Sequence, residues 1–188
     1  TRLAKTVGNK NAFTIYKALV EITEKATSNI DIDKRIYFSD AIIDEKWPND
    51  YKEVQKGADL GERMCNAFQD GFDDGYAEIV LIGSDLPNIT ENVINDAFYQ
   101  LRTNEVVFGP AEDGGYYLVG LSKFYSCIFQ NKAWSTSTLL NETLADDAEL
   151  DNFTSCDVGC YIREGETRYD YRTTLIIEEE TNFNFEYC

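Results

Sequence analysis

The stretch that decides the fold reads EIVLIGSDLPNIT at residues 78–90 and, after a helix-like segment, EVVFGPAEDGGYYLVGL at residues 105–121. In each half, a short apolar run ends at a glycine, and an acidic residue and a turn follow. Glu78–Ile82 shows no polar alternation, which is typical of a parallel strand buried on both faces. Ligands of open α/β sheets bind at the carboxyl ends of such strands. We therefore expect Asp85 and Asp113 to face one site, where two carboxylates could hold a divalent metal together with a substrate phosphate.

The segments on either side of this stretch alternate between helical and strand patterns. Asn88, with Glu91 three residues later, is the expected N-cap of the helix that carries Ile94 and Leu101. The alternation predicts an α/β fold with a mainly parallel central sheet. We expect a single domain over residues 1–188, with a divergent tail at 150–188. Apolar spacing predicts further helices near 11–26, 64–72 and 139–144, and short apolar runs predict strands at 35–39, 105–108, 116–121 and 172–177.

The composition excludes several functional classes. The 188 residues carry a net charge of −17, which argues against nonspecific nucleic-acid binding because that binding needs a basic surface. No apolar run approaches the roughly 20 residues that span a bilayer, so we expect no membrane partner. The chain has no histidine, which excludes Ser-His-Asp and Cys-His nucleophile schemes and histidine-based zinc sites. Acid–base chemistry must then come from Asp, Glu, Lys, Tyr or Cys.

The cysteines indicate a cytoplasmic protein. There are five of them, and their spacing, including Cys156 and Cys160, matches neither a redox pair nor a zinc motif. Free thiols in a reducing cytoplasm are the expectation. A glycosylation triplet at Asn88 would put a glycan beside the proposed site, which further disfavours secretion.

Two turns are the main candidates for a binding site. After Gly83, which lets a ligand approach the backbone closely, come Ser84 and then Asp85, which projects from the strand tip as a metal ligand. The alternative is an aspartate that caps the following helix. The Asp113-Gly114-Gly115 turn, followed by Tyr116, suits a backbone that closes over a sugar or a base. Its alternative is a plain β-hairpin, for which Asp-Gly is the strongest short signal.

Other segments supply further candidate contacts. A glycine-rich turn at 55–63 opens a helix whose N-terminus would favour anions, although a solvated helix face is the alternative for its arginine. Trp134 and Ser135, later in the chain, offer an indole for stacking and a hydroxyl for hydrogen bonds. A buried structural tryptophan beside a helix cap is the alternative. The candidates are Arg2, Gly57, Asp59 and Arg63, with Gly83 and Ser84, for nucleotide phosphates, and Gly114, Gly115, Tyr116, Trp134 and Ser135 for the substrate.

Taken in their order along the chain, these motifs resemble those of a bacterial transferase family of glycosyltransferase-A-like fold. This family is the selenodomain-associated or arsenosugar-biosynthesis glycosyltransferases. The similarity covers roughly residues 1–145. More distantly, Asp85 and the Asp-Gly-Gly turn are similar to those of guanylyltransferases for molybdenum cofactor and for phospholactate, in which matching aspartates bind the metal. The resemblance implies a three-layer nucleotide-diphospho-sugar transferase-like fold with a mainly parallel central sheet. The matching segments are Thr1–Ala4, Gln55–Arg63, Gly83–Pro87, Gly109–Leu121 and Trp134–Thr136.

The resemblance also implies a function. It is metal-dependent transfer from a nucleotide-activated donor, a nucleotide sugar first, to a small-molecule acceptor, with Mg²⁺ or Mn²⁺ as cofactor. Asp85 and Asp113 would be the catalytic residues and the metal ligands, and Asp113 would otherwise position the acceptor. One alternative is nucleotidyl transfer from an NTP to a phosphorylated acceptor. The other is a catalytically inactive nucleotide-binding module.

Two departures from the family pattern affect these expectations. The family's first strand, which is central in its sheet, and the glycine-rich loop after it would lie before Thr1. We therefore expect this sequence to lack that strand, and a segment trimmed before Thr1 is the simpler explanation. The tail beyond residue 150 is rich in Cys and Tyr and matches the family poorly. Acceptor recognition and oligomeric state therefore stay open.

Overall fold

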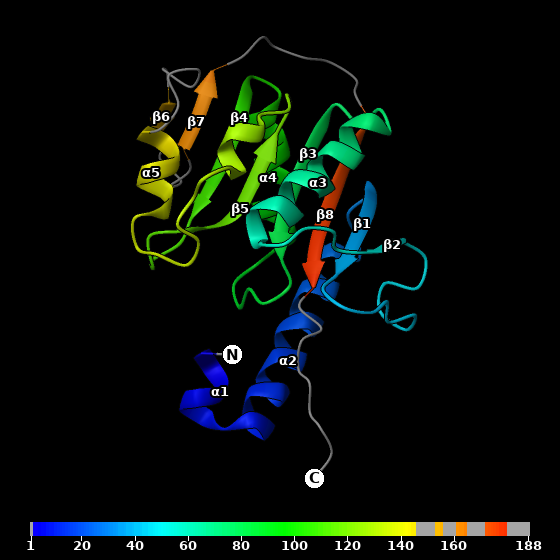
Figure 1. Ribbon diagram of the computed structural model, residues 1–188. Coiled ribbons are helices and arrows are strands. Elements are labelled where there is room, and N and C mark those ends of the chain that lie inside the picture. Colours follow the sequence, from blue (N-terminus) through cyan, green and yellow to red (C-terminus); the bar gives the residue numbers. More distant parts are fainter. Residues whose placement is uncertain (1, 146–152, 156–160, 165–171, 180–188) are drawn as a thin grey trace.

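The computed structural model describes residues 2–145, 153–155, 161–164 and 172–179, with side chains at 4–145 and 172–178. Within these residues, eight strands form one sheet in the order β2-β1-β8-β3-β5-β4-β7-β6 (Figure 1). The strands are β1 (Asp33–Phe38), β2 (Tyr51–Val54), β3 (Glu78–Gly83), β4 (Asn104–Pro110), β5 (Tyr116–Leu121), β6 (Phe153–Ser155), β7 (Tyr161–Glu164) and β8 (Thr173–Glu179). The helices are α1 (Arg2–Val7), α2 (Asn9–Thr27), α3 (Leu60–Asp73), α4 (Glu91–Leu101), the 3₁₀ helix η1 (Ser126–Phe129) and α5 (Leu139–Ala145).

The sheet is parallel in one half and mixed in the other. β2, β1, β8 and β3 are joined by parallel pairings. β5 is antiparallel to both β3 and β4, and β7 is antiparallel to both β4 and β6. β5 and β7 are thus the two described strands that run against the rest, and the expected mainly parallel sheet is confirmed. The β4–β5 connection is an antiparallel hairpin, the alternative that Asp113-Gly114 also allowed.

Helices cover both faces of the sheet, which gives three layers. Consecutive residues of a strand point to opposite faces, and β3 shows this directly. Ile79 and Leu81 join a core cluster that includes Met64 and Phe68 of α3. Val80 and Ile82 join a second cluster with residues of α2 and α4. None of the helices in the described part of the chain combines the length and apolar character needed to cross a membrane.

The helix that follows β3 begins later than the sequence pattern indicated. Its N-cap is Thr90, whose side chain accepts a hydrogen bond from the Val93 backbone N–H at 3.3 Å. The prediction of Asn88 as the N-cap was therefore wrong. Thr90 has the extended backbone of an N-cap residue, and Val93, whose N–H lies in the first turn of the helix, is three residues further along the chain. This is the geometry that capping requires.

The last described strand lies in the middle of the sheet. β8 pairs in parallel with β1 on one side and with β3 on the other. Leu175, Ile176 and Ile177 are all completely buried. The predicted strand at 172–177 is confirmed, and it belongs to the core of the sheet. The resemblance assigns a central position to the strand before Thr1, whereas here a strand near the end of the sequence has a central position.

Candidate functional site

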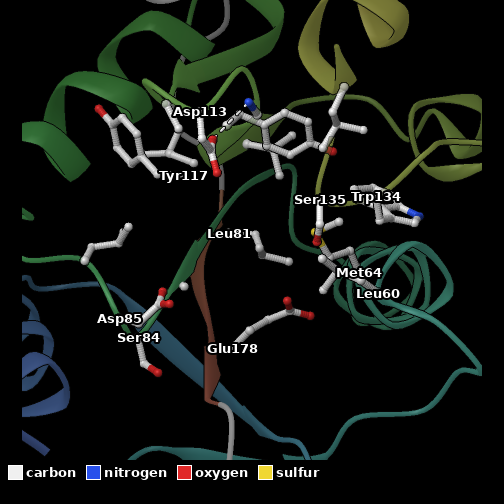
Figure 2. Close-up of a pocket in the computed structure, with 18 of the residues that line it drawn as sticks. Leu60, Met64, Leu81, Ser84, Asp85, Asp113, Tyr117, Trp134, Ser135 and Glu178 are labelled. Atoms are coloured by element: carbon white, nitrogen blue, oxygen red, sulfur yellow. Dashed lines mark hydrogen bonds between the residues drawn. The ribbon is translucent and has the colours of Figure 1, made fainter. Parts of the chain in front are cut away.

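A cavity of about 530 Å³ opens at the carboxyl edge of the parallel strands. Figure 2 shows walls from the ends of β3 and β8, from the β4–β5 hairpin and from α3. Gln55, just after β2, also lines the cavity. Because parallel strands end at one edge, the turns that follow them meet there. This cavity is therefore the position at which the sequence predicted a binding site.

The turn after β3 supplies the first acidic residue of the cavity. Ser84 is buried, and its backbone N–H donates to the Glu178 carbonyl at 3.0 Å, which extends the pairing of β3 with β8. Asp85 follows and is exposed at the cavity. A Cβ on Gly83 would lie 3.0 Å from Asp85 Oδ1, so the glycine leaves room for that carboxylate. Figure 2 shows Ser84 and Asp85 together on one side of the cavity.

The β4–β5 hairpin supplies the second aspartate. Asp113 Oδ1 accepts a hydrogen bond from the Gly115 N–H at 3.2 Å, so the side chain closes its own turn. The Ala111 N–H donates to the Gly115 carbonyl at 3.0 Å, which completes the hairpin. Gly114 lies at φ +88°, the left-handed region that favours glycine. Its carbonyl accepts from the Leu140 N–H at 3.0 Å, and this bond joins the hairpin to α5.

We expect Gly114→Ala to destabilise the protein by about 3 kcal/mol. Alanine at positive φ costs about 1–2 kcal/mol, and overpacking adds about 1–3 kcal/mol, because a Cβ at Gly114 would collide with the backbone oxygen of Ser137. Gly75→Ala is the matched control, since Gly75 lies at φ +85° and a Cβ there would meet no atom nearer than 4.0 Å. Urea unfolding of both variants measures the difference, and equal losses would show that no collision occurs at residue 114.

The N-terminus of α3 forms an apolar wall opposite Asp85. Leu60 and Met64 line the cavity there, beside Trp134 and Ser135 (Figure 2). Trp134 lies against Gly61, where a Cβ would come within 2.6 Å of the indole and 2.5 Å of the Phe129 carbonyl oxygen. Only glycine therefore lets the tryptophan pack this close to the helix.

The turn before α3 stabilises the helix end. Asp59 is the N-cap and accepts from the Glu62 N–H at 2.9 Å, while the Glu62 carboxylate accepts from the Ala58 N–H at 2.8 Å. Arg63 donates from Nε to the Gly57 carbonyl and from Nη1 to Gln55 Oε1, both at 3.3 Å. Part of the Arg63 guanidinium is therefore used in hydrogen bonds that stabilise the turn.

β8 brings a third carboxylate to the cavity. Glu178 lies two residues after Ile176, so its side chain is on the same face of the sheet as α3, and only 9% of the residue is exposed. Figure 2 shows its carboxylate directed into the cavity, between Asp85 and the α3 wall. Burial raises the pKa of the Tyr116 hydroxyl, and the negative charge of Glu178 raises it further. The Tyr116 hydroxyl is buried with no hydrogen-bond partner among the described residues.

We therefore expect Tyr116→Phe to leave stability at pH 7 unchanged or slightly higher, because a buried hydroxyl without a partner contributes nothing that offsets its desolvation. The pKa of Tyr116 is higher in the folded protein than its ordinary value of about 10, so the tyrosine ionises first in the unfolded chain as the pH rises. The contribution of Tyr116 to the free energy of unfolding is therefore present below about pH 10 and is lost as the pH rises towards the pKa of the folded protein. The variant should lose less stability than the wild type between pH 9 and 11. Urea unfolding across this range measures it. Tyr99→Phe, at a residue 64% exposed, is the control and should follow the wild type.

A second cavity of about 510 Å³ lies at the opposite, amino edge of the strands. Its charged residues pair with one another: Lys34 with Asp50 at 3.5 Å, Arg172 with Asp33 at 3.7 Å, and Arg35 with Asp74. The Arg35 guanidinium also lies over the Tyr51 ring, 4.3 Å from its centroid. Because these charges cancel locally, the arrangement indicates a structural network, and the first cavity is the candidate site.

The sequence profile of a family described as "Uncharacterized protein conserved in bacteria (DUF2064)" matches residues 31–136. This segment is more than half of the chain and runs from just before β1 to the cavity residues Trp134 and Ser135. The chain belongs to the DUF2064 family. No curated protein matches the DUF2064 chain significantly.

A solved structure supports the same fold for this DUF2064 chain. It is the crystal structure of a "putative nucleotide-diphospho-sugar transferase" from Desulfovibrio desulfuricans G20. The two are 27% identical, with a TM-score of 0.71, over 95% of this chain and 73% of the other. The predicted three-layer, nucleotide-diphospho-sugar transferase-like α/β fold is thereby confirmed.

The structure brings most of the predicted site residues of the DUF2064 chain to one cavity. Gly57, Asp59 and Gly114 do not line it: the first two belong to the turn that caps α3, and Gly114 packs against Ser137. The side chain of Arg2 lies outside the described residues, as do Cys156 and Cys160. The predicted residues that do line the cavity are Arg63, Gly83, Ser84, Asp85, Asp113, Gly115, Tyr116, Trp134 and Ser135.

Several lining residues of the DUF2064 chain were not predicted from the sequence. Tyr16 reaches the cavity from α2, and Leu60 and Met64 reach it from α3. Glu178 is the most consequential omission, because it adds a negative charge. Its only sequence signal was the acidic end of the predicted strand at 172–177, and nothing local indicated that this strand would lie beside β3.

The cavity offers carboxylate oxygens as the possible metal ligands. No group of three or more Asp, Glu, Cys or His side chains in the described part of the chain is close enough to hold an ion. Asp85 and Asp113 could still contribute singly or as a pair. Such a donor set fits Mg²⁺ or Mn²⁺, since hard cations bound by one or two carboxylates complete their coordination with water and substrate phosphates.

Proposed function

We propose that this DUF2064 protein is a divalent-metal-dependent transferase that uses a nucleotide-diphospho-sugar as its donor and a small molecule as its acceptor. The observation that carries the proposal is that Asp85 and Asp113, which lie in turns after two different strands, line one cavity at the carboxyl edge of the sheet. The similarity of the fold to that of the Desulfovibrio protein supports a nucleotide sugar as the donor.

The charge of the cavity supports the requirement for a metal. Among the described residues that line it, Asp85, Asp113 and Glu178 are acidic and Arg63 is basic, an excess of two negative charges. Two like charges about 4 Å apart near a protein surface repel each other by about 4 kcal/mol. A diphosphate would therefore bind poorly beside these carboxylates unless a cation bound with it.

The two sides of the cavity would have different roles in binding the donor. On one side, Asp85 and Asp113 would hold the ion, which when bound would neutralise the charge that develops on the departing diphosphate. On the other side, Leu60, Met64 and Trp134 would contact the apolar surface of the donor and exclude water from it. The hydrogen bond from the Gly115 N–H orients the Asp113 carboxylate towards the space between the two sides.

A thermal-shift panel tests the proposal. UDP-, GDP-, ADP- and CDP-sugars and the matching NTPs are added with and without Mn²⁺, because a ligand that binds the native state raises the melting temperature. The proposal requires a Mn²⁺-dependent shift with at least one nucleotide sugar and release of the nucleoside diphosphate on addition of acceptors. A shift with NTPs alone, with pyrophosphate as product, would instead indicate nucleotidyl transfer. Metal-dependent binding without any turnover would indicate an inactive binding module.

A further inference from the structure

Two threonines lie on the buried face of α2. Ala12, Tyr16, Val20, Thr23 and Thr27 follow one another at helical spacing, and all but Tyr16, which lines the cavity, are buried. Thr23 and Thr27 are both completely buried. A buried hydroxyl costs free energy unless it is hydrogen-bonded. Both hydroxyls therefore need hydrogen-bond partners inside the protein.

The two hydroxyls belong to a buried chain of hydrogen bonds. Trp47 Nε1 donates to Thr27 Oγ1 at 3.1 Å, and Thr27 Oγ1 donates to the Thr23 carbonyl at 2.9 Å. Thr23 Oγ1 in turn has two acceptors, the Ser84 carbonyl at 3.1 Å and the Leu19 carbonyl at 3.3 Å. A hydroxyl has one proton to donate, and the Ser84 carbonyl is the nearer acceptor. The chain of bonds thus runs from the loop before β2, through α2, to the end of β3.

The Ser84 backbone is consequently held from two elements. Its N–H donates to the Glu178 carbonyl of β8 at 3.0 Å, and its carbonyl accepts from Thr23 of α2. The carbonyl of Ser84 and the nitrogen of Asp85 belong to one peptide group, which is planar. A hydrogen bond that fixes this oxygen therefore also fixes the direction in which the backbone of Asp85 leaves the strand.

We propose that Thr23 is a positioning residue that holds the Ser84–Asp85 peptide and thereby sets the position of the Asp85 carboxylate in the cavity. The inference rests on the proposed function in so far as it assigns the metal to Asp85. The bond itself links α2, which lies outside the segment matched by the family profile, to the strand end inside it. Thr23 contacts the backbone beside Asp85 and needs no contact with the substrate.

Three variants test this role. Thr23→Val keeps the shape of the side chain and removes its donor, and Thr23→Ser restores the hydroxyl. Thr174→Val is the matched control: Thr174 is also completely buried, and its hydroxyl donates to the Asp33 carbonyl at 3.0 Å, at the opposite edge of the sheet. The measurements are the melting temperature, the amide hydrogen exchange of residues 84–86 in metal-free protein, and the dissociation constant of Mn²⁺ alone by electron paramagnetic resonance.

We expect Thr23→Val to speed exchange at residues 84–86 about fivefold and to weaken Mn²⁺ binding about fivefold, the equivalent of one lost buried hydrogen bond. Thr23→Ser should restore both, and Thr174→Val should lower the melting temperature comparably without either effect. The inference is overturned if Thr23→Val and Thr174→Val give the same exchange at residues 84–86. If the wild type binds no Mn²⁺, the proposed metal site fails, whereas the exchange comparison still decides whether Thr23 positions the end of the strand.

Discussion

Asp85→Asn is expected to weaken metal-dependent nucleotide-sugar binding by on the order of a hundredfold or more. Loss of a residue that only supports a metal ligand typically costs about 10- to 100-fold in metal affinity or activity, so loss of the ligand itself should reach at least the upper end. The asparagine retains the shape of the side chain but removes the negative charge. Because Asp85 is exposed at the cavity, the melting temperature without ligand should not change.

Isothermal titration with the donor found in the thermal-shift panel, in the presence and absence of Mn²⁺, measures this effect. Asp44→Asn is the control, since Asp44 is exposed in the loop between β1 and β2 and does not line the cavity. It should bind like the wild type. If Asp85→Asn binds the donor with the same metal dependence as the wild type, the assignment of Asp85 as a metal ligand is wrong.

Ile176→Ala is expected to lower the free energy of unfolding by about 2–5 kcal/mol, the range for an isoleucine truncated in a well-packed core. Small domains unfold with about 5–15 kcal/mol in total, so this one change would remove a large part of the stability. The reason is the position of β8 between β1 and β3, where Ile176 is completely buried and packs in the cluster beneath α3. Urea unfolding followed by circular dichroism measures the loss.

Ile15→Ala is the matched control for this prediction. Ile15 is 38% exposed on α2, and alanine is a better helix former, so the change should stay within about 0.5 kcal/mol. A loss below about 1 kcal/mol for Ile176→Ala would contradict the central placement of β8. Such a result would mean that Ile176 does not pack in the core between β1 and β3.

The helices and strands with strong periodic patterns could be predicted from the sequence. α2 and α3 carry apolar residues at helical spacing, and β3 is a short continuous apolar run. In α2 the burial departs from this pattern, because Ile15 and Ile22 are exposed whereas Thr23 and Thr27 are buried. The N-cap of α4 was misplaced by two residues, since Asn88 and Thr90 are both good capping residues and only the backbone geometry distinguishes them. The strand β2 was missed because its four residues are only partly buried and show no clear alternation.

Part of the site could also be predicted from local sequence. Asp85 and Asp113 each follow a strand end, and such ends meet at one edge in a parallel arrangement, so their shared cavity was predictable. Gly57 and Asp59 were predicted to bind phosphate, and the structure places them in the turn that caps α3, outside the lining of the cavity. A helix N-terminus uses the same residue types for capping as for binding anions. Sequence alone does not separate these two roles.

By itself, the sequence determined the class of the fold, the strand ends on which the two aspartates lie, and the exclusion of histidine chemistry. Only the tertiary structure decided that β8 lies between β1 and β3, that Glu178 therefore enters the cavity, and that Thr23 of α2 bonds to the backbone beside Asp85. The physical reason is that turns, caps and periodic faces depend on neighbours in the chain. Strand order and buried side-chain hydrogen bonds depend on residues that are far apart in the sequence, such as Thr23 and Ser84, whose numbers differ by 61, and no local pattern records which of these pair.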